Sequence, residues 1–107
     1  MCGLSFSSLK DGIVLRIVTC NSVYNIRKLR EQDALILGGF DRNREIRYPN
    51  WLKIVITGST WGGLSIRPNW IQKDMLLEFL EVERNRVMTT SPVRQISSDY
   101  PQGAFFL

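Results

Sequence analysis

Arginine side chains and aromatic rings are interleaved in the first half of this 107-residue sequence. Guanidinium groups bind phosphates through a planar fork, and aromatic rings stack on nucleobases. A surface that holds a single strand of nucleic acid needs both kinds of group. The residues predicted to form such a surface are Arg16, Arg27, Arg42, Arg44, Arg47, Lys53 and Arg67, with Tyr24, Tyr48 and Trp61 as the rings.

The positive charge of the chain lies in the same stretch. The formal net charge is +4, from 14 basic and 10 acidic residues. Residues 10–53 hold nine basic and five acidic residues, so they carry the whole excess. Phe40 and Trp51 add further aromatic rings there. This pattern favours an acidic partner such as nucleic acid. The alternative is that these side chains are simply solvated positions on the wet face of a sheet.

The sequence contains no histidine, which removes the catalytic and metal-binding chemistry that depends on imidazole. Cys2 and Cys20 are the only cysteines and form no metal-binding set. Two free thiols are the simplest interpretation, and the alternatives are one disulfide or lipidation of Cys2. We expect a non-catalytic protein without a metal or a small-molecule cofactor.

The first ten residues have neither a charged leader nor a long apolar core, so they do not resemble a secretory signal. The uninterrupted apolar runs are also far shorter than the ~18 residues of a membrane span. These features predict a cytoplasmic or nuclear protein that does not contact membranes.

Short β-branched stretches separated by turn residues predict a series of strands. They cover residues 13–19, 23–29, 34–37, 46–48, 51–57 and 61–66. Asn21 and Ser22 connect the first two strands as a hairpin. Gly38 and Gly39 end the third strand, and Pro49 ends the fourth.

The register of the first hairpin decides which side chains face water. If Leu15 and Ile17 point inward, Arg16 must face outward. Asn25 and Arg27 of the second strand then lie beside Arg16 on the outer face.

From Asn69 to Arg86, apolar residues recur at helical spacing. The apolar stripe consists of Ile71, Met75, Leu76, Phe79, Leu80 and Val82. Pro68 and Asn69 fit the start of a helix, and arginines fit its last turn. This pattern predicts one long amphipathic helix that packs on the sheet.

Residues 89–107 show little periodicity and contain two prolines, so they are interpreted as an extended C-terminal arm beyond a domain of residues 1–88. The last residues are apolar, which is unusual for a disordered tail. We expect Phe105, Phe106 and Leu107 to dock either on the domain or on a second copy. We also expect the protein to be a homo-oligomer, with the arm supplying the contact.

One segment of the chain resembles part of the sequence of a known protein family. It consists of Gly62-Gly63-Leu64-Ser65-Ile66-Arg67-Pro68-Asn69-Trp70 and the predicted helix that follows. It is similar to the end of the single-stranded-DNA-binding ββββα domain of the transcriptional coactivators, over residues 51–82. The resemblance implies a dimer whose curved strands form channels for single strands, with helices at the dimer contact. It also implies channel positions for Lys53, Trp61, Ser65 and Arg67. The chain departs from the family in its extra strands before the match, its long arm and its lack of a lysine-rich leader.

Together these features predict an α+β fold: a curved antiparallel sheet of five to six strands, followed by one long amphipathic helix and a C-terminal arm. The first functional hypothesis is a non-catalytic, homodimeric protein that binds single-stranded DNA or RNA. The second hypothesis is a small protein-interaction or assembly module, for example a viral accessory or structural protein, that oligomerises through the arm.

Overall fold

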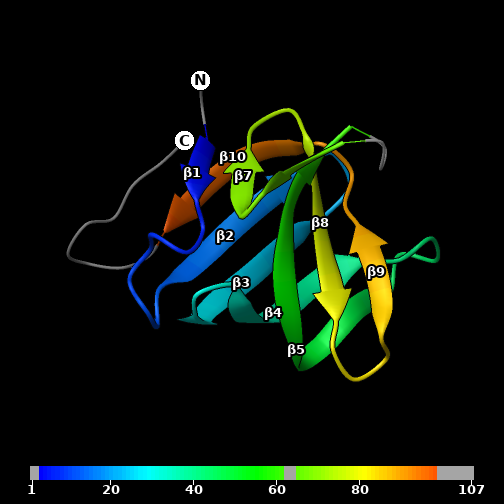
Figure 1. The fold of residues 1–107 in the computed structure, drawn as a ribbon. Helices are drawn as coiled ribbons and strands as arrows, with labels where there is room; N and C mark the ends of the chain where they lie inside the picture. Colours follow the sequence, from blue (N-terminus) through cyan, green and yellow to red (C-terminus); the bar gives the residue numbers. More distant parts are fainter. Residues whose placement is uncertain (1–2, 62–64, 99–107) are drawn as a thin grey trace.

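The computed structural model describes residues 3–61 and 65–98, and within these residues the protein is built from strands alone. Figure 1 shows how they curve around a common interior. The strands are β1 (Gly3–Ser5), β2 (Val14–Thr19), β3 (Val23–Arg30), β4 (Asp33–Phe40), β5 (Ile46–Thr60), β6 (Ile66–Pro68), β7 (Trp70–Gln72), β8 (Leu76–Glu81), β9 (Arg86–Thr89) and β10 (Val93–Ser98).

Eight of these strands form one antiparallel sheet in the order β10-β2-β3-β4-β5-β8-β9, with β6 paired to β5 beside this path. β1 and β7 form a separate two-stranded sheet. The large sheet curls back on itself. The backbone of Val93, at the start of β10, accepts a hydrogen bond from Asp74 and donates one to Met75, just before β8. β10 and β8 lie at distant positions in the sheet, so these bonds partly close it.

The core fills the inside of this curl. Its members alternate with exposed or half-buried residues along each strand, which is the period of a sheet with one buried face. The core residues are Phe6, Leu15, Ile17, Tyr24, Ile26, Ala34, Ile36, Tyr48, Ile54, Ile56, Ile71, Leu77, Phe79, Val93 and Ile96.

The first hairpin is confirmed. β2 and β3 pair from Val18 with Val23 back to Val14 with Arg27. Leu15 and Ile17 are completely buried. Arg16 is exposed and pairs with Asn25, as the predicted register requires.

The third strand does not end at its glycines. β4 runs through Gly38 and Gly39 to Phe40, although both residues have a positive φ, of 95° and 75°, which glycine adopts without a steric penalty. A side chain at Gly39 would collide with the ring of Tyr24, since a Cβ atom there would lie 2.3 Å from Cε1 of that ring. The glycines therefore let β4 pass closely over Tyr24.

The fourth and fifth predicted strands are one element. β5 continues from Ile46 through Pro49 to Thr60, with an irregularity where it pairs with β4 between Ile36 and Gly38. Proline is tolerated there because the strand is irregular at that point. The predicted turn at residues 58–60 is part of the same strand. The predicted strand 61–66 lies partly outside the described residues.

The α+β prediction is wrong, because the segment from Asn69 to Arg86 contains no helix. It forms β7, β8 and the first residue of β9, joined by turns. Asn69, Asp74 and Asn85 have positive φ values of 60°, 72° and 48°. Asn and Asp tolerate this conformation better than other non-glycine residues, and each one breaks a helix. The helix that the coactivator resemblance implies is therefore absent here.

The predicted arm also begins too early. Val93–Ser98 form β10, which pairs with β2, and Val93 and Ile96 are completely buried. These residues belong to the sheet and the core. The rest of the predicted arm, residues 99–107, lies outside the described part of the chain.

Candidate functional site: an arginine-lined groove

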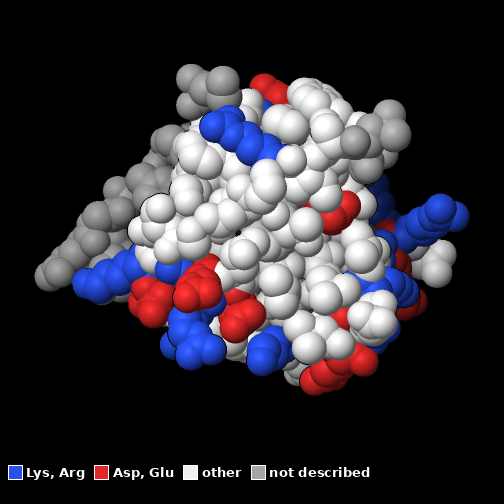
Figure 2. All heavy atoms as spheres, viewed as in Figure 1, with Lys and Arg blue, Asp and Glu red and all other residues white. Residues whose placement is uncertain are grey.

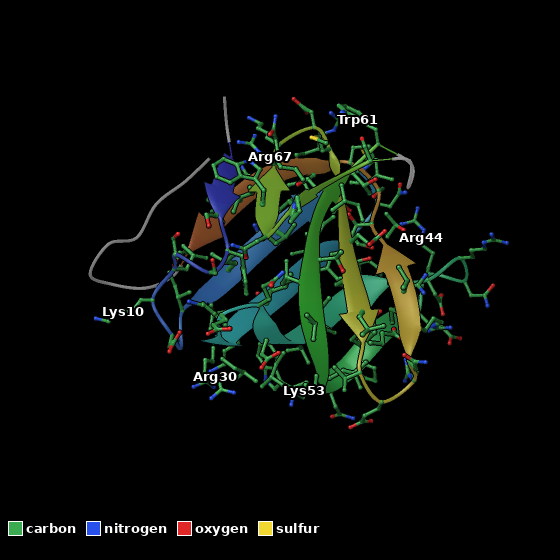
Figure 3. All side chains as sticks on the ribbon, in the orientation of Figure 1. Lys10, Arg30, Arg44, Lys53, Trp61 and Arg67 are labelled. Atoms are coloured by element: carbon green, nitrogen blue, oxygen red, sulfur yellow. The ribbon has the colours of Figure 1, made fainter. Side chains whose placement is uncertain are left out.

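A pocket of about 380 Å³ opens between the β2–β3 turn and the β4–β5 loop. We call it the arginine pocket. It is lined by Cys20, Asn21, Phe40, Asp41, Arg42, Arg44 and Arg47. Figure 3 shows Arg44 on the loop that projects at the right of the molecule. The structure thus brings together three of the predicted phosphate-binding residues.

The β4–β5 loop is held in shape by Asp41. Its backbone N–H donates to the carbonyl of Glu45 over 2.9 Å. Its Oδ1 atom accepts hydrogen bonds from the backbone N–H groups of Asn43, at 2.8 Å, and Glu45, at 3.0 Å. Arg44 adopts a positive φ of 64° within this turn. These bonds fix the backbone from which Arg42 and Arg44 extend.

The opposite wall is the β2–β3 turn, which Thr19 organises. Its Oγ1 atom accepts hydrogen bonds from the backbone N–H groups of Asn21 and Ser22, at 3.3 and 3.0 Å. Ser22 in turn connects the two walls, because its Oγ atom accepts a hydrogen bond of 2.8 Å from the backbone of Phe40. The Phe40 side chain remains 45% exposed, so its ring is available for stacking.

The arginine pocket has an excess of positive charge. Within the described residues, Arg42, Arg44 and Arg47 form no ion pair or hydrogen bond through their side chains. Asp41 is the single acidic residue in the lining, and one of its oxygens is already bonded to the loop backbone. The pocket therefore offers several unused donors to an anion.

Two further pockets adjoin the arginine pocket, and Arg47 lines all three. The middle pocket, of about 180 Å³, reaches Tyr24 and Thr89. The third, of about 280 Å³, includes Trp51 and Arg84, and we call it the tryptophan pocket. Because they share Arg47, we treat the three as one groove along this end of the sheet.

Tyr48 belongs to the lining of the tryptophan pocket, but it does not offer the exposed ring that the sequence predicts. Its side chain is 1% exposed, and its hydroxyl donates a hydrogen bond of 2.5 Å to Oε2 of Glu81. Burial raises the pKa of Tyr48 above its usual value, and the hydrogen bond and charge of Glu81 raise it further. Tyr48 therefore acts as a neutral donor inside the core.

Glu81 itself is completely buried and satisfied by three side chains. Besides Tyr48, its Oε1 atom lies 3.0 Å from Nε of Arg86 and its Oε2 atom lies 3.5 Å from Nη1 of Arg84. Burial alone would raise the pKa of Glu81. The hydrogen bonds from Tyr48 and Arg86 and the charges of both arginines outweigh burial and hold this pKa below its usual value.

Arg16, Arg27 and Lys53 lie on a different surface, the outer face of the large sheet. Arg27 and Lys53 flank Leu35 in one row across β3, β4 and β5. Arg16 lies diagonally beside Arg27 on β2. Figure 2 shows basic and acidic groups intermixed along the lower edge of the molecule, where Figure 3 places Lys53. The positive charge near Lys53 is thus partly compensated (Figure 2 and Figure 3).

Trp61 and Arg67 lie at the opposite end of the molecule from Lys53 (Figure 3). The guanidinium of Arg67 lies 4.0 Å from the centre of the Trp70 ring, and its Nη1 atom donates to Oε1 of Gln72 over 3.1 Å. Ser65, which precedes β6, is exposed. The structure therefore does not bring Lys53 together with the other residues that the resemblance implies for a channel.

Lys28, one of the nine basic residues in the first half, is internal. Its Nζ atom donates to the backbone carbonyls of Ser7, at 2.9 Å, and Leu9, and lies 3.1 Å from Oδ1 of Asp11. This lysine fixes the segment before β2 and contributes no charge to an open surface.

Sequence reasoning missed several lining residues of the groove. The sequence pattern marks Phe40 and Trp51 as aromatic without assigning them to the site, and it predicts no binding role for Cys20, Asn21 or Arg84. The available signal was their position at turns, since Asn21 follows β2 and Phe40 precedes the arginine-bearing loop. Turns at one end of a sheet meet in space, but only the strand order shows which turns these are.

Two further kinds of feature are relevant to function in the described part of the chain, metal-ligand clusters and membrane-spanning helices. Residues 3–61 and 65–98 contain no group of three or more His, Cys, Asp or Glu side chains suited to a metal ion. In the same residues there is no helix with the length and apolar character to cross a membrane. Phe105, Phe106 and Leu107, the predicted oligomerisation residues, lie outside the described residues.

Comparisons of the chain with protein-family models, with curated proteins and with solved structures found no match.

Proposed function

We propose that this protein is a non-catalytic nucleic-acid-binding protein, and that the arginine pocket holds the phosphates of a single strand. The observation that carries this proposal is the convergence of Arg42, Arg44 and Arg47, without ion-pair partners among the described residues, around a pocket beside the exposed ring of Phe40. Arginine forks suit phosphate oxygens, and an exposed ring suits a base.

Salt dependence of binding provides the main test. Bound phosphates release counterions, so affinity for a single-stranded oligonucleotide falls as salt rises, with a slope of about −0.7 per neutralised phosphate. We expect Arg44→Gln or Arg47→Gln to weaken binding about tenfold, or ~1.4 kcal/mol, and to reduce the magnitude of this slope. Fluorescence anisotropy over a series of salt concentrations measures both quantities.

The matched control removes the same charge from the outer face of the sheet. If the arginine pocket is the binding site, Arg16→Gln and Arg27→Gln leave the affinity nearly unchanged. If these variants lose as much as the pocket variants, the outer face with Lys53 is the binding surface. Salt-independent binding, or no binding to DNA or RNA oligonucleotides, removes the proposal altogether.

Cys20 supplies a readout located in the pocket itself. Its thiol is exposed and belongs to the lining. In a Cys2→Ser background, a bound oligonucleotide should slow alkylation of Cys20 by a small thiol reagent. An alkylation rate that stays the same at saturating oligonucleotide would place the ligand elsewhere.

A further inference from the structure

The tryptophan pocket extends the arginine pocket in a way that the proposed function does not require. Trp51 is 42% exposed, and Arg47 and Arg84 contribute positive charge to the same pocket. Arg84 is bonded to Glu81 through one nitrogen only, at 3.5 Å, and its side chain is 52% exposed. A second exposed aromatic ring with basic neighbours thus lies in a pocket that shares Arg47 with the arginine pocket.

We propose that the groove has two stacking subsites, Phe40 and Trp51, and that one single strand of several nucleotides occupies both with its phosphates at Arg47 between them. This inference rests on the proposed function. It goes further because it names Trp51 and Arg84 as binding residues, and it predicts that the contribution of Trp51 to affinity depends on the length of the ligand.

The strand geometry limits how far apart the two stacking subsites lie along β5. Phe40 pairs with Ile46 across β4 and β5. Trp51 lies five residues farther along β5, a Cα separation of at most about 17 Å at ~3.4 Å per residue. Stacked nucleotides advance by about 3.4 Å each along a strand. Over this part of β5 a stacked single strand therefore spans at most about five nucleotide steps.

The positive charge of the lining and the need for open base faces both favour a single strand of nucleic acid as the occupant. Across the arginine and tryptophan pockets, the lining contains Arg42, Arg44, Arg47 and Arg84 against two acids, Asp41 and Glu83. This balance matches a polyanion. Stacking on two separate rings requires bases whose faces are open, and a duplex keeps its bases stacked on each other.

The test measures how the affinity lost in Trp51→Ala depends on the length of the ligand. We expect a tract of about eight nucleotides, within the range bound by single folds of this size, to bind the native protein about tenfold more tightly than it binds Trp51→Ala. Arg84→Gln should show a smaller loss. A dinucleotide, which fills one subsite, should bind the native protein and Trp51→Ala equally.

Trp61→Ala is the matched control, because Trp61 is 61% exposed but lies outside the groove. Ribose and deoxyribose tracts are measured side by side.

Tryptophan emission gives a second readout that does not depend on affinity. A base stacked on Trp51 should quench its fluorescence, so quenching by the longer tract should persist in Trp61→Phe and disappear in Trp51→Phe. If the longer tract binds but neither length nor Trp51 matters, the two-subsite inference is wrong and the proposed function stands. If a duplex of equal length binds as well, the inference is wrong and the proposed preference for a single strand is wrong with it. If no oligonucleotide binds the native protein, both are wrong.

Discussion

At the scale of single residues, the buried carboxylate of Glu81 connects the core with the groove. It accepts a hydrogen bond from Tyr48, and Tyr48 is adjacent in sequence to Arg47, which lines all three pockets. Arg84, which lines the tryptophan pocket, bonds to the same carboxylate. One internal group therefore helps to position two sides of the groove.

Replacing this carboxylate should change how stability depends on pH. The pKa of Glu81 is lower in the folded protein than its usual value, so the unfolded chain binds more protons in the acid range. The stabilisation by Glu81 is thus complete above the unfolded pKa of about 4.3 and is lost as the pH falls through the folded pKa. We expect Glu81→Gln to cost about 1–3 kcal/mol at neutral pH and much less at strongly acid pH.

Urea denaturation at several pH values measures this difference. Glu83→Gln is a suitable control, because Glu83 is exposed and lies in the adjacent turn. A Glu81→Gln penalty that stays constant from neutral to strongly acid pH would show that the charge of Glu81 does not stabilise the fold.

Individual residues show the limit of sequence reasoning about the site. The pairing of Arg16 with Asn25 could be predicted, because one hairpin with a short turn determines it. The burial of Tyr48 and Glu81 could not, because their contact joins residues 33 positions apart. Likewise, the sequence gives no sign that Lys28 is anything other than a solvent-exposed lysine. In the structure, its amine donates to backbone carbonyls of a loop distant in sequence.

At the scale of elements, the segment after Pro68 fits two periods at once. Ile71, Met75 and Phe79 recur at helical spacing, but Leu77, Phe79 and Glu81 alternate inward at strand spacing. The outcome depends on pairing, because β5 and β9 each supply hydrogen bonds to β8. Single-sequence periodicity contains no information about those partners, so tertiary pairing overrides the helical signal.

Gly58 is an element-scale feature whose removal should be costly. Its φ is 148°, and a Cβ atom there would lie 2.1 Å from the backbone oxygen of Arg67 in β6. Because that oxygen belongs to a paired strand, the clash cannot be relieved by a side-chain rotation. We expect Gly58→Ala to lower the free energy of unfolding by roughly 2–3 kcal/mol or more.

Gly12 provides the matched control for this substitution. Its φ is also positive, at 88°, but a Cβ atom there would meet nothing within 4 Å. Gly12→Ala should therefore cost only the backbone strain, about 1 kcal/mol. Thermal or urea unfolding of both variants measures the contrast, and equal losses would mean that the contact between β5 and β6 contributes little.

At the scale of the whole molecule, the charge distribution could be predicted better than the fold. The excess of basic residues in the first half follows directly from the sequence, and part of it does gather at one pocket. Which part gathers depends on the curl of the sheet. The loop that bears Arg42 and Arg44 meets the β2–β3 turn because Gly38 and Gly39 let β4 continue over Tyr24.

The last prediction concerns assembly, and it follows from the sequence of the C-terminus. Phe105, Phe106 and Leu107 form an apolar end that favours docking on a second copy. If they hold an oligomer together, deleting residues 103–107 should lower the solution mass measured by light scattering, while circular dichroism of the sheet stays unchanged. The described lining of the arginine pocket comes from the β2–β3 turn and the β4–β5 loop, so we expect the truncated protein to keep its affinity for a dinucleotide and its salt dependence. A mass that does not change on truncation would contradict the prediction. Loss of binding together with loss of mass would instead show that a complete binding site needs two copies of the chain.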